Sequence, residues 1–266
     1  MHSAALETTD HASGIHTPAP SNYARIAGLA YLLAIVPPVL NLALIQPHLV
    51  QAGDVVGTAA RIASHPTLFR LGLALDLLMF AAVLLLSATH HVVLATVDRN
   101  LSLVALVFRA SEAVLGCVMV LAGALVPVLA DGRAALDATQ AAALIDLLLK
   151  VRAVGMDYLL VLMCLGAIPF CWLFYTSRYV PRRLSGFGIA CYALILLGSL
   201  TNILTPRYAS WTMLAFAPGT LFELTIGGWL LLRGVSVEHG NPHRRHTAPP
   251  RKPASDTDRE HHGSRA

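Results

Sequence analysis

The sequence predicts an all-α fold, a polytopic membrane bundle of six transmembrane helices with two short amphipathic extracytoplasmic helices. Of its 266 residues, 56% are hydrophobic and only 13% are charged, whereas about a quarter of a soluble domain is charged. The mean hydropathy is +0.63. The apolar residues form runs of roughly 20 or more, long enough to cross a bilayer, without the alternation of barrel strands. Such runs must be helical, because hydrocarbon offers backbone groups no other hydrogen bonds.

Six apolar runs qualify as spans, and polar sequence flanks them on both sides. The predicted spans are Ile26–Ile45, Leu71–Val97, Leu101–Ala130, Val154–Tyr175, Leu184–Leu204 and Trp211–Leu232. They belong to one transmembrane domain of residues 23–234. Residues 1–22 and 235–266 are rich in Ser, Thr, Pro, His and charged residues and lack periodicity, so we expect two disordered tails.

The first span and the segment after it contain clear local signals. Pro37 and Pro38 lie within the span and predict a kink, since neither residue has an N–H to donate. Asp54 precedes the segment VVGTAARIAS, which stops at His65-Pro66. This pattern predicts a short helix with an Asp N-cap. It is too short to cross the bilayer, so we expect it to lie on the membrane surface or to cover the bundle.

The next three connections are a short turn, a longer segment and a second short turn. The 98–100 connection is tight, so the second and third spans should be antiparallel neighbours. After the third span, Asp137 can cap a second short amphipathic helix that ends near Leu149, before the fourth span begins. The turn Tyr175–Gly186 then joins the fourth and fifth spans and is the most basic short loop of the chain.

The distribution of basic residues predicts the orientation. Both tails, the 98–100 connection and the turn Tyr175–Gly186 fall on one side of the membrane, which holds twice as many Lys and Arg residues as the other side. Short cytoplasmic loops carry an excess of Lys and Arg. We therefore expect a plasma (inner) membrane protein with both termini in the cytoplasm.

Five ionisable residues fall inside the predicted spans: Asp76, Arg109, Glu112, Asp157 and Glu223. Each costs roughly 2.5–3.5 kcal/mol at the bilayer centre, so we expect them to face a common polar interior. Arg109 and Glu112 are one helical turn apart and can pair. We expect a cavity that opens outward and ends on Arg109, Glu112 and Glu223, with Asp76 and Asp157 in its outer third. Four carboxylates face one Arg, so some should carry a proton.

Three functions are compatible with such a site. The preferred one is a small transporter or channel-like protein that binds a small solute or ion. A second is a non-catalytic membrane protein that binds a partner, the buried charges then being a polar clamp that fixes helix register. The third is an intramembrane hydrolase with Asp76 and Asp157 sharing a proton. Metalloprotease and serine-hydrolase motifs are absent from the sequence, so an enzyme is less favoured.

The sequence gives no reason to expect a cofactor, a metal or a nucleic-acid partner. The histidines of the C-terminal tail are irregularly spaced, unlike ligands of defined geometry. Paired histidines that would hold a haem between spans are also missing. The four cysteines all fall inside predicted spans, so no disulfide framework is indicated. The lipid bilayer is the one partner that the sequence predicts, and it leaves the oligomeric state open.

Five segments carry a resemblance to a known family: ARIAGLAYLL (Ala24–Leu33), FRLGLALDLL (Phe69–Leu78), FRASEAVLG (Phe108–Gly116), YTSRYVPRRLSGFG (Tyr175–Gly188) and PGTLFELTIGGWLLLRGV (Pro218–Val235). Through them the chain resembles a bacterial integral membrane family, domain of unknown function number 4386, over nearly all of residues 24–235. The resemblance implies a six-helix membrane protein. It implies no activity, because none is assigned to the family.

Overall fold

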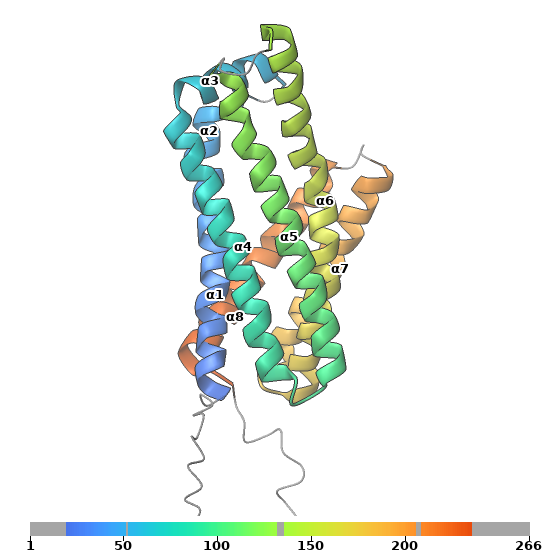
Figure 1. Cartoon of the computed structure of the whole chain (residues 1–266). Helices are drawn as coiled ribbons and strands as arrows, with labels where there is room; N and C mark the ends of the chain where they lie inside the picture. Colours follow the sequence, from blue (N-terminus) through green and yellow to red (C-terminus); the bar gives the residue numbers. More distant parts are fainter. Residues whose placement is uncertain (1–19, 52, 132–135, 206–208, 236–266) are drawn as a thin grey trace, which may run out of the picture.

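The computed structural model describes residues 20–51, 53–131, 136–205 and 209–235. Most of the two predicted tails, residues 1–19 and 236–266, therefore lies outside the described residues. Within them all regular structure is helical (Figure 1). The elements are α1 (Pro20–Leu40), the π-helix η1 (Asn41–Ile45), α2 (Gln46–Leu49), α3 (Val55–Ser64), α4 (Pro66–Leu94), α5 (Arg99–Ala130), α6 (Ala138–Ser177), α7 (Arg182–Leu204) and α8 (Ala209–Arg233).

The surface and the helix lengths fit a membrane protein. Within the described residues, five helical stretches are long and apolar enough to cross a bilayer by length and composition: Asn22–Leu49, Pro66–Leu94, Arg99–Ala130, Thr139–Ser177 and Arg182–Leu204. Large apolar side chains are exposed on the outside of the bundle, among them Val114 (62%), Leu121 (64%) and Leu197 (64%). So much exposed apolar surface is uncommon on a water-soluble monomer, and in a bilayer it contacts acyl chains.

The six long helices close into a ring. Each of α1, α4, α5, α6, α7 and α8 packs against the next one in the chain, and α1 also packs against α8. The predicted antiparallel pairing of the second and third spans is confirmed as α4 against α5. The start of α1, the α4–α5 and α6–α7 connections and the end of α8 lie at one end of the bundle (the lower end in Figure 1), and α3 lies at the other.

The first span differs from the prediction in where it becomes irregular. Pro37 and Pro38 lie within α1, which continues to Leu40. The irregular part follows them as the π-helix η1. A π-helical turn inserts one extra residue into the helix and is often found at functional sites. Here Asn41 starts it and is buried, so an amide reaches the interior of the ring.

The short helix predicted after Asp54 is present as α3. The Asp54 side chain accepts a hydrogen bond from the Gly57 amide at 2.8 Å, which satisfies one of the free amides of the first turn. The helix ends at Ser64, and α4 begins at once with Pro66 at its first position. Ile62 of α3 is fully buried and packs with Val126 and Ile145, so α3 covers one end of the ring.

The second predicted short helix is wrong as a separate element. The structure has one helix of 40 residues, α6, which joins that segment to the fourth span. The predicted cap is correct, since Asp137 forms a capping box with Gln140. The break was expected near Lys150, but residues 149–154 contain neither Gly nor Pro, and a helix without a breaker continues. At 1.5 Å per residue α6 is about 60 Å long, roughly twice the thickness of a bilayer core.

Candidate functional site

The most buried charges of the described residues form an ion pair within α5. Arg109 Nη1 lies 2.6 Å from Glu112 Oε2, and the two side chains are only 7% and 4% exposed. Gly166 of α6 makes room for the Arg109 stem. A Cβ at Gly166 would lie 2.6 Å from Arg109 Cγ and 2.8 Å from the Ala105 carbonyl oxygen. The close approach of α6 therefore places the Arg109 stem against this glycine.

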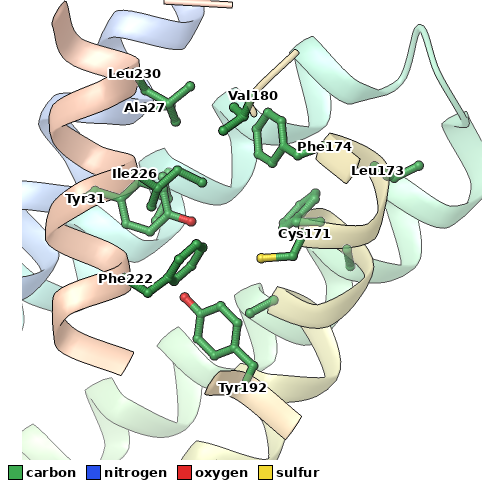
Figure 2. Packing of buried hydrophobic residues seen from close by; sticks show 14 of the residues in the cluster. Ala27, Tyr31, Cys171, Leu173, Phe174, Val180, Tyr192, Phe222, Ile226 and Leu230 are labelled. Atoms are coloured by element: carbon green, nitrogen blue, oxygen red, sulfur yellow. The ribbon is translucent and has the colours of Figure 1, made fainter. Parts of the chain in front are cut away.

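A second carboxylate reaches the same region from α8. Glu223 accepts a hydrogen bond from the Tyr192 hydroxyl of α7 at 2.7 Å and lies within electrostatic range of Arg109 and Glu112. Tyr31 of α1 brings another hydroxyl toward Tyr192. Figure 2 shows both tyrosine hydroxyls directed into the ring between α8 and α6. One guanidinium thus pairs with one carboxylate and lies within electrostatic range of a second carboxylate and of both phenols.

A close crossing of α1 and α8 fixes the position of Glu223 relative to α1. A Cβ on Gly28 would lie 2.7 Å from the Gly227 carbonyl oxygen and would also collide with the backbone of Leu231. On the other side, a Cβ on Gly227 would lie 2.8 Å from Cβ of Tyr31. Since Glu223 lies one turn before Gly227, the crossing fixes the carboxylate and Tyr31 relative to each other.

His90 of α4 adds a buried imidazole. It is 2% exposed, and its ring centroid lies 5.1 Å from Phe170, 5.2 Å from Phe174 and 5.4 Å from Tyr31. Arg109 is within electrostatic range of this imidazole. We call the following residues the central cluster: Tyr31, His90, Arg109, Glu112, Tyr192 and Glu223. With the buried thiols of Cys164 and Cys171 on α6, every helix of the ring contributes to it.

A second polar group joins four elements nearer the α3 end. Asp76 Oδ2 of α4 lies 2.9 Å from Arg152 Nη2 of α6. Asn41 of η1 donates to Asp76 Oδ1 at 2.9 Å and to the Gly72 carbonyl at 3.3 Å. Arg152 Nη1 donates to the Met119 carbonyl of α5 at 2.8 Å. The carboxylate and the guanidinium each have two partners.

Asp157 of α6 belongs to this polar level too. It accepts a hydrogen bond from Asn202 Nδ2 of α7 at 3.2 Å, and it lies little more than one turn from Arg152 on the same helix. We call the following residues the upper layer: Asn41, Asp76, Arg152, Asp157 and Asn202. Met119, which contacts this layer, lies seven residues beyond Glu112 in α5, so the two groups are about 10 Å apart along the helix axis.

The structure thus divides the predicted site residues between two levels. Arg109, Glu112 and Glu223 are together in the central cluster. Asp76 and Asp157 are in the upper layer, where Arg152 and Asn202 are their respective partners. Among the described residues, no group of three or more His, Cys, Asp or Glu side chains is arranged to hold a metal ion.

Sequence reasoning missed Arg152, Tyr31 and Tyr192 as site residues. Arg152 falls between the short helix predicted to end near Leu149 and the fourth span predicted to begin at Val154, so it is not among the predicted intramembrane charges. The sequence feature that could identify Arg152 is the absence of a helix breaker around it, because the helix then continues and places Arg152 inside the bundle. The signal for Tyr192 is its place in the middle of a span, since tyrosines that anchor a helix at the interface lie near its ends.

Comparisons with known proteins give one match. The family model described as "Domain of unknown function (DUF4386)" matches residues 26–234. None of the curated proteins and none of the solved structures matches the chain. The family match covers most of the chain and nearly all of the helix ring, including both polar levels. The chain therefore belongs to the DUF4386 family, whose function is unknown.

Proposed function

We propose that this protein is a multi-pass membrane transporter of a small solute or ion and that its central cluster binds a proton. The observation that carries the proposal is that this cluster contains two carboxylates and only one guanidinium, which is a surplus of one acidic group. Arg109 pairs with Glu112 at 2.6 Å, and Glu223 is a second carboxylate within its electrostatic range. An uncompensated charge away from water is costly. Binding one proton removes the surplus and leaves one ion pair.

The same geometry links proton binding to helix movement. Glu112 is on α5 with Arg109, whereas Glu223 is on α8. When Glu112 carries the proton, Arg109 is attracted to Glu223 and draws α8 toward α5; when Glu223 carries it, Arg109 pairs with Glu112 alone. The two proton positions therefore favour two helix arrangements, and a ligand that binds one of them better shifts the population toward it.

The topology in this proposal has six spans, with α8 as the sixth. Its 25 residues measure about 37 Å at the usual rise, enough for a bilayer core. The exposed arginines Arg99, Arg178, Arg182 and Arg233 lie at the end of the bundle where α1 begins and α8 ends (Figure 1). By the positive-inside rule this end is cytoplasmic in the inner membrane. The upper layer then lies between the outer end of the bundle and the central cluster.

A flux measurement tests the proposal. The full-length protein is reconstituted into liposomes that contain a pH-sensitive dye, and a potassium diffusion potential is imposed with valinomycin. We expect proton entry above that of protein-free liposomes, and its loss in Glu112→Gln and Glu223→Gln. The matched control is Asp146→Asn, since Asp146 forms an exposed pair with Lys150 on α6. Proton entry that is the same in both Gln variants as in the wild type would remove the proposal.

The alternative of an intramembrane hydrolase gains no support from these contacts. Asp76 is engaged by Arg152 and Asn41, and Asp157 by Asn202. A pair of carboxyl groups that shares one proton needs the two in direct contact. The described hydrogen bonds give the two aspartates different partners on different helices.

A further inference from the structure

The turn between α6 and α7 presents a dense group of arginines. Arg178, Arg182 and Arg183 are all exposed, and residues 177–185 contain no acidic residue. We call these three residues the basic turn. Their positive charge is therefore not balanced within the turn.

The Arg182 guanidinium and the backbone of the basic turn are held in place. Arg182 Nε donates to the Tyr175 carbonyl at 3.3 Å, and its guanidinium lies 5.2 Å from the centre of the Tyr175 ring. Arg178 ends α6 in the left-handed conformation, with φ of 59°, which is uncommon for a residue other than glycine. Tyr179 is within hydrogen-bond distance of Thr96 in the α4–α5 connection, at 3.3 Å. A positioned guanidinium loses less freedom when it binds an anion.

Two exposed aromatic side chains lie near these charges in the sequence, one on α6 and one on α7. Trp172 is 51% exposed and stacks on Tyr175 with ring centres 5.9 Å apart. Phe187 of α7 is 41% exposed. Trp172 precedes the turn by about one and a half helical turns, and Phe187 follows Arg183 by one, so both lie on the membrane side of the arginines. A soluble anion would contact the guanidinium groups alone, whereas an amphiphile would contact the guanidinium groups and the aromatic side chains.

We propose that the basic turn binds the headgroup of an anionic phospholipid and that the acyl chains of this lipid lie along Trp172 and Phe187. Guanidinium groups bind phosphate oxygens through charge-assisted, often bidentate, hydrogen bonds. Basic residues near an anionic membrane surface each strengthen the attraction to it. The site is distinct from the central cluster, and it does not depend on the transport role.

Lipid titration of the full-length protein tests this site. The protein in neutral detergent is titrated with phosphatidylglycerol or phosphatidylcholine, and binding is followed by the melting temperature. We expect stabilisation by phosphatidylglycerol only. In the Arg182→Gln/Arg183→Gln variant the apparent affinity should fall about 30-fold, which corresponds to about 2 kcal/mol. Arg182→Lys/Arg183→Lys should keep most of the affinity, because it keeps both charges.

The control is Arg70→Gln, which removes an exposed arginine of α4 from the other end of the bundle and should bind phosphatidylglycerol as the wild type does. A third arm uses glycerol phosphate without acyl chains. If it stabilises the protein as strongly as the lipid at equal concentration, the site is one for soluble anions and the lipid proposal is wrong. An unchanged affinity in the double Gln variant would also overturn it.

Discussion

The two arginine–carboxylate pairs inside the ring differ in what they connect. Asp76 and Arg152 join α4 to α6, and Asn41 and the Met119 carbonyl complete their hydrogen bonds. Such a pair fastens helices together. Arg109 and Glu112 both lie on α5, so their pair by itself does not connect two helices. It is nevertheless the more buried of the two.

This difference bears on why charges are present inside the bundle. A polar clamp that fixes the positions of helices explains the upper layer well, because Asp76 pairs with Arg152 on another helix and Asp157 accepts a hydrogen bond from Asn202 on a third. It explains the central pair poorly, because Glu223 adds a second carboxylate to one guanidinium. Charges that are costly to bury and do not tie helices together point to function.

The largest effect is expected from Arg109→Gln. It removes the cation and leaves Glu112 and Glu223 facing each other, and breaking a buried pair in this way costs about 3–5 kcal/mol. Denaturant unfolding in detergent measures the loss, and adding Glu112→Gln should restore part of it. If Arg109→Gln is less destabilising than Arg152→Gln, the contrast between the two pairs is wrong.

Arg152→Gln should have the next largest effect, a loss of about 2–3 kcal/mol, since it removes an ion pair with Asp76 and a hydrogen bond to a carbonyl. The side chains of this pair are partly exposed, at 25% and 15%, so water can compensate some of the loss. In a double-mutant cycle with Asp76→Asn, unfolding should give a coupling of about 1–2 kcal/mol. Proton entry into liposomes should persist; its loss would assign the upper layer a direct part in proton binding.

Gly166→Ala tests whether α6 positions Arg109. The new methyl group would lie 2.6 Å from Arg109 Cγ, so helix or side chain must move, and overpacking costs about 1–3 kcal/mol. Gly228 of α8 is the matched control, because a Cβ there meets nothing within 4 Å. Gly228→Ala should leave the free energy of unfolding unchanged or raise it slightly. Equal effects of the two substitutions would contradict the close packing at Gly166.

The smallest effect is expected from Tyr192→Phe, which removes the hydroxyl that donates to Glu223 at 2.7 Å and keeps the ring. The hydrogen bond should contribute about 1–2 kcal/mol to unfolding. Because the change affects the α8 side of the central cluster, it should also alter the pH dependence of proton entry. If Tyr192→Phe leaves both properties unchanged, Tyr192 is not part of the cluster.

Local features were predictable from the sequence and long-range pairings were not. The Arg109–Glu112 pair follows from helical spacing within one span, and the Asp54 cap from a few neighbouring residues. The partner of Asp76 is far away in the chain, at Arg152, and its identity depends on the order of helices in the ring. The continuity of α6 shows the same limit: charged residues near Lys150 resemble a helix end, but Arg152 contacts Asp76 of α4 and the Met119 carbonyl of α5.

Infrared spectroscopy of the carboxyl groups tests the surplus of acid in the central cluster most directly. Purified full-length protein in lipid is examined at neutral pH for the carbonyl band of a protonated carboxylic acid. We predict that the wild type has this band, that Glu112→Gln and Glu223→Gln each lose it, and that Asp76→Asn keeps it. A wild-type protein without the band, or a band that survives in both Gln variants, would contradict proton binding by the central cluster.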